Sequence, residues 1–122
     1  MLEANARKCE FLESVARDFP NVRVLLGRAE ERGTDYLGVA VAKALASPPV
    51  AVEWCLPLVA IGGAAILFVG PSANAGAVAR VAVQLGGGVP EVHPGILVVP
   101  KLGPTPPGFP RRPGIARKRP LV

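Results

Sequence analysis

The chain has 122 residues, of which half are hydrophobic, and it carries a net charge of +5 with 14 glycines and 14 prolines. This length fits one domain, and the apolar content is sufficient for a core. Two distant cysteines without a CxxC motif give poor support to a zinc site or a disulfide framework, and both thiols are expected to be reduced and buried. Charged residues within the first ten positions break any early apolar run, so no signal peptide is expected.

The first stretch places Glu3 directly after two apolar residues and before a helical pattern. Apolar side chains at helical spacing predict a helix over Asn5–Asp18 with Asn5 as its N-cap. An acid at the carboxyl end of a parallel strand, just before a helix, suits the two hydroxyls of a ribose. The alternative is an ordinary acid near a helix start, favoured by the helix dipole. These residues alone leave both interpretations open.

The next apolar run, Val22–Leu26, predicts a short buried strand. It ends at Gly27, and Ala29 and Glu30 follow, so a second strand end carries a small residue and then acids. In a nucleotide site, an adenine amino group finds its acceptor at such a position. A solvated loop is the alternative interpretation.

The middle of the chain contains short apolar runs separated by proline and glycine. Glu53 is the one charged residue between positions 44 and 79. These prolines and glycines disfavour a membrane span, which needs about 20 unbroken apolar residues. Short apolar runs of this kind favour strands buried on both faces of a parallel sheet. The predicted elements are a strand over Leu37–Ala42, a helix from Ser47-Pro48-Pro49 that Pro57 ends or bends, a turn at Gly62-Gly63, a strand over Ala64–Val69 and a helix over Asn74–Leu85.

The last third predicts a hairpin and then a basic segment. Val89–His93 and Ile96–Leu102 can pair about Pro94-Gly95, and strand–helix alternation ending in an antiparallel hairpin indicates an α/β fold. Residues 101–122 contain six basic side chains and no acid, and the prolines predict an extended segment. The six are Lys101, Arg111, Arg112, Arg117, Lys118 and Arg119. Such a segment predicts a polyanion partner, most simply RNA, with a solvated terminus as the alternative.

The sequence offers few groups for acid–base chemistry. It has one histidine and therefore no Ser–His–acid set, no close pair of carboxylates on one element, and no phosphate loop. We expect no metal site. Methyl transfer to an unprotonated ring nitrogen suits such a chain, because the sulfonium donor is already activated and positioning can supply the rate.

Several motifs together resemble one family. The run from Leu2-Glu3-Ala4-Asn5 to Cys9 is similar to the second-strand motif of the RsmG methyltransferases, also called glucose-inhibited division protein B. Gly27-Arg28-Ala29-Glu30 is similar to their third-strand motif. The most specific match is the C-terminal segment that contains Lys101, Thr105-Pro106 and Phe109-Pro110-Arg111-Arg112-Pro113-Gly114.

The resemblance implies a fold. It implies a truncated, Rossmann-like class I sheet of an S-adenosylmethionine-dependent methyltransferase that ends in an antiparallel hairpin, with the first strand and its glycine-rich turn missing. Residues 1–102 are then a partial methyltransferase domain, and residues 103–122 are a basic, proline-rich tail of the same domain. Because the missing strand lies between the second and fourth strands of the family's sheet, we expect a split sheet.

The resemblance also implies a function, namely methylation of guanine N7 in 16S ribosomal RNA of the small subunit in the cytoplasm. By this resemblance Glu3 holds the ribose, and Ala29 and Glu30 lie against the adenine of S-adenosylmethionine. Lys43 takes a catalytic position near the sulfonium, where the family has an arginine. The RNA-binding residues are Arg111, Arg112, Arg117, Lys118 and Arg119. The alternative is a non-catalytic RNA-binding remnant, because the cofactor loop is absent.

Overall fold

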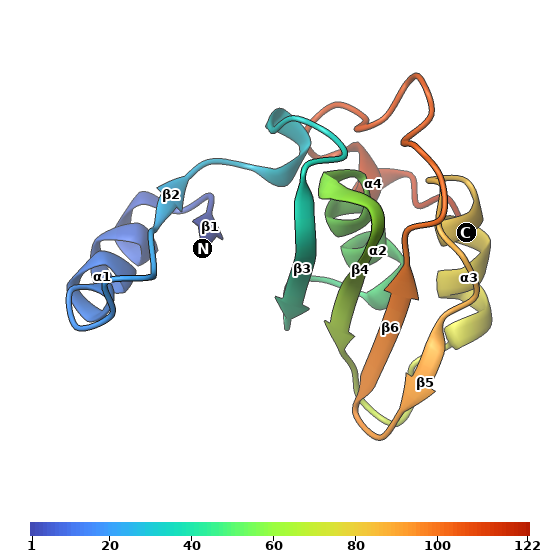
Figure 1. Cartoon of the computed structure of the whole chain (residues 1–122), viewed down its shortest axis with the longest axis horizontal. Coiled ribbons are helices and arrows are strands. Elements are labelled where there is room, and N and C mark those ends of the chain that lie inside the picture. Colours follow the sequence, from blue (N-terminus) through green and yellow to red (C-terminus); the bar gives the residue numbers. More distant parts are fainter.

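The computed structural model describes residues 1–122 and contains two separate sheets (Figure 1). The first is a parallel pair of β1 (Leu2–Glu3) and β2 (Leu25–Leu26). The second has four strands in the order β3-β4-β6-β5. Their bounds are Leu37–Lys43 for β3, Val59–Phe68 for β4, Glu91–His93 for β5 and Ile96–Pro100 for β6.

Four α-helices and two short 3₁₀ turns connect these strands. The helix α1 joins the two strands of the small sheet, whereas α2, α3 and α4 lie behind the larger sheet in Figure 1. Their bounds are α1 Ala6–Ala16, α2 Pro48–Cys55, α3 Ala75–Val83 and α4 Ile115–Lys118, with 3₁₀ turns at Ala29–Glu31 and Leu56–Leu58. No helix combines the length and the apolar character that a bilayer crossing requires.

The topology confirms an α/β fold and a split sheet. β3 and β4 are parallel, β4 and β6 are antiparallel, and β5 and β6 form the expected hairpin. β1 pairs with β2 and not with β3, so the two sheets present separate edges. The N-terminal unit of β1, α1 and β2 therefore stands apart from the main body (Figure 1).

The helix ends follow the predicted capping residues. The side-chain oxygen of Asn5 accepts the Lys8 N–H at 3.1 Å, and that of Asn74 accepts the Ala77 N–H at 3.0 Å. These contacts satisfy N–H groups that a helix start otherwise leaves unpaired. Helix α2 ends at Cys55, and a 3₁₀ turn through Pro57 follows, because proline has no N–H for a helical hydrogen bond.

Two predicted strand limits were wrong. The strand expected over Val22–Leu26 is reduced to Leu25–Leu26, with only β1 as a neighbour. The turn expected at Gly62-Gly63 lies inside β4, which begins at Val59. The pairing of β3 with β4 shifts register between Leu37 and Val39, so the extra residues are absorbed as a bulge. Glycine is needed at position 63 because an added Cβ would collide with the Gly38 carbonyl oxygen.

The core lies between one face of the larger sheet and the helices. Alternate residues of β3, β4 and β6 point into it, and Val78 and Val81 of α3 are fully buried against them. The inward-facing strand residues are Ala40, Ala42, Ala65, Leu67, Leu97 and Val99. The two thiols, Cys9 and Cys55, are free and buried as expected.

The expectation of an extended tail was wrong. Residues after β6 fold over the helical layer, and helix α4 packs against α2. Ala116 of α4 is 2% exposed, and Phe109 and Leu121 pack against the core. The prolines break regular structure in this segment, but its apolar side chains hold it to the body.

Candidate functional site: a cofactor edge and a basic tail

Glu3 ends β1 and is fixed by the start of α1. Its side-chain Oε1 accepts the Asn5 N–H at 2.9 Å, and its carbonyl oxygen accepts the Gly27 N–H at 2.9 Å and the Cys9 thiol at 3.3 Å. Glu3 Oε2 has no protein partner. The carboxylate is half-buried, at the carboxyl end of a parallel strand, which is where nucleotide ligands bind α/β sheets.

Glu3 and Lys43 line one cavity. A hollow of about 290 Å³ lies between the N-terminal unit and the end of β3. Its walls are Met1, Leu2, Glu3, Leu12, Val41, Ala42, Lys43 and Leu45. The Lys43 Nζ lies 5.9 Å from the centre of the Phe68 ring, so a cation–π contact supports the side chain. The structure thus brings together two of the predicted site residues from distant strands.

Ala29 and Glu30 lie in the 3₁₀ turn that follows β2, and they do not line this cavity. Glu30 Oε1 accepts the Gly114 N–H of the tail at 3.4 Å. Glu30 therefore connects the end of the small sheet to the C-terminal segment. Its predicted contact with adenine stays a prediction.

Arg111 makes a two-pronged ion pair with Glu53. The Arg111 Nε–Glu53 Oε1 distance is 2.6 Å, and the Nη2–Oε2 distance is 2.7 Å. The Glu53 side chain is 4% exposed and that of Arg111 is 21% exposed. Arg111 Nη2 also donates to the Arg119 carbonyl oxygen at 2.9 Å. Through these two parallel hydrogen bonds, the Arg111 guanidinium anchors the tail to α2. Its predicted RNA contact stays a prediction.

The other predicted tail residues are exposed. Arg117 lies over the Trp54 ring, with its Cζ 5.2 Å from the ring centre, and donates to the Leu45 carbonyl oxygen at 3.1 Å. Arg112, Lys118 and the Arg119 side chain reach solvent. These cations sit on a folded surface over α2, where a polyanion can approach them.

Lys101 departs from the expected basic segment, because it is 1% exposed. Its Nζ donates to Asp35 Oδ1 at 2.7 Å, to the carbonyl oxygens of Leu56 and Val59 at 2.8 and 2.9 Å, and to Thr105 Oγ1 at 2.9 Å. Burial raises the pKa of Asp35, but hydrogen bonds from Lys101 and Thr105 outweigh it and hold that pKa below its ordinary value. The expectation that Lys101 contacts RNA was wrong.

Sequence reasoning missed the acidic partners of Lys101 and Arg111. Glu53 carried a signal, since it is the one charged residue in a long apolar stretch, and a buried charge requires a partner. Asp35 carried none, because it sits among other charged and polar residues before β3. Its backbone has φ of +56°, a conformation that the tertiary contacts impose.

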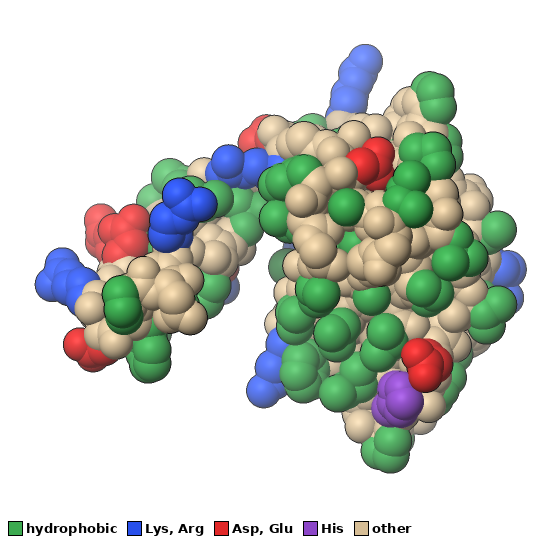
Figure 2. All heavy atoms as spheres, in the orientation of Figure 1, with side chains coloured by type: hydrophobic (Ala, Val, Ile, Leu, Met, Phe, Trp, Pro, Cys, Tyr) green, Lys and Arg blue, Asp and Glu red, His purple; other side chains and the backbone are tan.

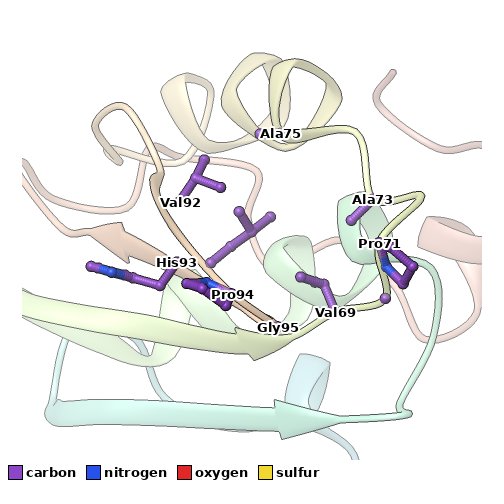
Figure 3. Close-up of a pocket in the computed structure, with 10 residues that line it drawn as sticks. Val69, Pro71, Ala73, Ala75, Val92, His93, Pro94 and Gly95 are labelled. Carbon is purple, nitrogen blue, oxygen red and sulfur yellow. The ribbon is translucent and has the colours of Figure 1, made fainter.

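A second hollow of about 420 Å³ lies at the carboxyl end of β4. Figure 3 shows Val69, Pro71 and Ala73 from the β4–α3 connection on one side and Val92, His93 and Pro94 from the hairpin on the other. Its lining is mostly apolar. Val69 N–H donates to the Gly95 carbonyl oxygen at 2.9 Å, so the backbone at its base is already paired.

The first cavity can accept the adenosine part of a nucleoside ligand. Glu3 keeps an oxygen free for a ribose hydroxyl, and the neighbouring walls from Leu2, Leu12 and Val41 are apolar, as a nucleoside requires. Lys43 is the cation at its border. These residues fit the ribose side of S-adenosylmethionine.

Comparison with known proteins indicates a family of methyltransferases. The family model GidB, described as rRNA small subunit methyltransferase G, matches residues 1–85. The chain is similar to proteins named ribosomal RNA small subunit methyltransferase G from Moorella thermoacetica, at 34% identity, and Carboxydothermus hydrogenoformans, at 36%. The matches cover 99% of this chain and 58% and 60% of the two relatives, so the chain spans less than two thirds of their length.

The match with the family model covers more than half of the chain and includes Glu3, Ala29, Glu30 and Lys43. The relatives extend the similarity over the tail, which the family model does not cover. The chain belongs to the GidB family, the family of rRNA small subunit methyltransferase G.

Proposed function

We propose that this chain is the adenosine-binding and RNA-facing part of an S-adenosylmethionine-dependent enzyme that methylates guanine N7 in 16S ribosomal RNA. Residues 1–102 form the partial methyltransferase domain, and residues 103–122 form its basic tail. The family membership supports methylation of small-subunit rRNA. The cofactor, the target atom and the residue roles are inferred from the site.

The observation that carries the proposal is the meeting of Glu3 and Lys43 on one cavity. These residues come from the carboxyl ends of β1 and β3, which belong to different sheets. The free oxygen of the Glu3 carboxylate can accept a hydrogen bond from a ribose hydroxyl. Lys43 can face the same ligand only because the fold brings the ends of β1 and β3 together.

The chain's own residues position the reactants. When bound, S-adenosylmethionine supplies an activated methyl group. Glu3 orients the ribose, and the apolar wall excludes water from the nucleoside. Lys43, supported by the Phe68 ring, places a positive charge at the border of the cavity, where it orients RNA. Guanine N7 carries no proton, so no general base is needed at this site.

The tail supplies RNA contacts from its folded surface. Arg112, Lys118 and Arg119 are exposed and are placed to meet phosphates, and Arg117 presents its guanidinium over Trp54. Arg111 holds this surface on α2 through its ion pair with Glu53. The partly exposed side of its guanidinium can add one more contact with RNA. Because phosphate contacts release counterions, RNA affinity should fall steeply with salt.

Titration of the ¹⁵N-labelled chain with S-adenosylmethionine tests the cofactor site by NMR, which detects weak binding. We expect weak, saturable shifts at backbone amides around Glu3 and at the end of β3. Glu3→Gln should abolish them, whereas Glu91→Gln, in an exposed acid on β5, should not. Shifts confined to other elements, or shifts that survive Glu3→Gln, would contradict the proposed site.

The second candidate function is a non-catalytic RNA-binding remnant. The observation that favours it is the hydrogen bond between Glu30 and the tail, because it occupies a carboxylate that the cofactor site would use. For this candidate, S-adenosylmethionine should cause no shifts, while RNA should still shift the amides of residues 112–119. The two titrations therefore separate the two functions.

A further inference from the structure

Arg117 is the one cation of the basic tail that lies over an aromatic ring. Its Cζ is 5.2 Å from the centre of the Trp54 ring. Trp54 belongs to α2 and is half-buried, whereas Arg117 belongs to α4 and is exposed. One side of the guanidinium therefore faces the indole, and a ligand can reach the group from the other side. Planar guanidinium groups favour such contacts with aromatic rings.

A second contact fixes the Arg117 guanidinium in this position. Its Nη2 donates a hydrogen bond to the Leu45 carbonyl oxygen at 3.1 Å. No carboxylate lies within ion-pair distance of Arg117, whereas Glu53 neutralises Arg111. The positive charge of Arg117 is thus uncompensated, and its orientation is set before a ligand arrives. Such preorganisation lowers the entropic cost of binding.

Leu45 connects this pair of side chains to the candidate cofactor cavity. The residue lines the cavity together with Glu3 and Lys43, and its carbonyl oxygen holds Arg117. Ala44, which precedes it, has φ of +53°, in the left-handed region that alanine rarely adopts. The chain therefore turns sharply directly after β3. A ligand on the accessible side of Arg117 is thus close to the border of the cavity.

The uncovered face of the larger sheet offers few cations to a polyanion. Figure 2 shows this face as mainly hydrophobic, and Val39 and Val41 of β3 are more than half exposed. Helix α4 lies behind the sheet in Figure 1, so the cations of the tail belong to the helical side. There, a phosphate needs only positive charge, which Arg112 and Lys118 also supply. A planar guanidinium fixed over a ring suits a flat nucleobase instead.

We propose that Arg117, supported by Trp54, stacks on an unpaired purine base of the RNA substrate at the border of the cavity. The proposal rests on the RNA-facing role of the tail in the proposed function, and it does not require cofactor binding. Arg117 is then a base-binding residue, and Trp54 is a positioning residue that acts through it. Because bases inside an RNA helix are stacked on one another, the substrate must present a loop, bulge or end at this place.

Fluorescence anisotropy with labelled oligoadenylate and oligouridylate of equal length tests the proposal. We expect tighter binding of oligoadenylate, because the larger purine ring stacks more strongly. Arg117→Lys keeps the charge but removes the planar group. It should lower the affinity for oligoadenylate by about three- to tenfold and abolish the purine preference, without changing the salt dependence. Arg112→Lys is the matched control in the same tail, and it should change neither the affinity nor the preference.

Two further measurements separate stacking from a structural role. Trp54→Leu should lower the purine preference, whereas Trp54→Phe, which keeps a ring, should retain it; circular dichroism verifies the fold of each variant. In NMR spectra of the ¹⁵N-labelled chain, the ring current of a stacked base should shift the Arg117 Hε resonance upfield, whereas a hydrogen bond to phosphate shifts it downfield.

The outcomes distinguish this proposal from RNA binding by the tail. Equal affinity of the unmodified chain for both oligonucleotides, equal effects of Arg117→Lys and Arg112→Lys, an unchanged preference in Trp54→Leu, or a downfield shift of Arg117 Hε would overturn base stacking and leave RNA binding by the tail intact. Failure of the chain to bind either oligonucleotide would overturn both.

Discussion

Replacement of Arg111 by alanine should destabilise the fold, although Arg111 belongs to a segment that resembles a free basic tail. The variant leaves the Glu53 carboxylate, 4% exposed, without either of its two short contacts. Loss of one partner of a buried pair costs about 3–5 kcal/mol. Since the Arg111 side chain is 21% exposed, we expect about 3 kcal/mol, at the lower end of that range.

Urea unfolding measures this loss, with the fluorescence of Trp54, the single tryptophan, as a probe next to Glu53. Arg112→Ala is the matched control. Arg112 is exposed, so its replacement should change the free energy of unfolding by no more than about 0.5 kcal/mol. The double variant Glu53→Leu with Arg111→Met should recover most of the stability, because both charges leave the interior together.

The same two variants separate structure from RNA binding. Arg112→Ala should reduce the slope of log affinity against log salt by about one unit while the fold stays intact. The reasoning would be refuted if Arg111→Ala were as stable as the unmodified chain and yet lost RNA affinity. Arg111 would then act directly on RNA, and its pairing with Glu53 would contribute little.

Three further outcomes concern Asp35, Lys101 and Cys55. The pKa of Asp35 is lowered in the folded state, so its contribution to stability is present above about pH 4 and is lost as the pH falls through the folded pKa; Asp35→Asn should remove this part of the acid dependence, and an unchanged acid profile would speak against it. Lys101→Met should cost about 3–5 kcal/mol in urea unfolding, because it leaves Asp35 without its cation, and a loss below 1 kcal/mol, the range of an exposed pair, would argue against a buried anchor. Burial raises the pKa of Cys55 to about 11, so this thiol should resist iodoacetamide at about pH 8 in the folded chain; rapid alkylation would show that the core opens.

Local patterns in the sequence predicted most of the elements because each carries its own signal. Asn5 and Asn74 cap helices by contacts within three residues, and Pro57 ends a helix through its missing N–H. The limits of β4 were not predictable in this way. Gly62-Gly63 is typical of a turn, but β3 pairs with the residues on either side of it, and backbone hydrogen bonds with Lys101, just after β6, hold it in a bulged strand. Pairing between distant segments decided that outcome.

Part of the candidate site was suggested before the structure was known. Glu3 follows two apolar residues before a helical pattern, the role of Lys43 was implied by the family resemblance, and the fold places both residues on one cavity. The ion pairs were not predictable, because Lys101 and Asp35 are 66 positions apart, and Arg111 and Glu53 are 58 apart. A charge count assigned both cations to the tail, whereas burial and partner geometry make one a core residue and the other an anchor.

The most direct measurement is methyl transfer by a full-length fusion. This chain is joined to the part of the Moorella thermoacetica relative that the match leaves out, and a labelled methyl group is followed from S-adenosylmethionine to guanine N7 of unmethylated 16S rRNA. We expect transfer, with cofactor affinity reduced about 5- to 150-fold in Glu3→Gln, which corresponds to about 1–3 kcal/mol for a lost polar partner. A folded fusion that transfers no methyl group, or that binds the cofactor equally well after Glu3→Gln, would contradict the proposed site.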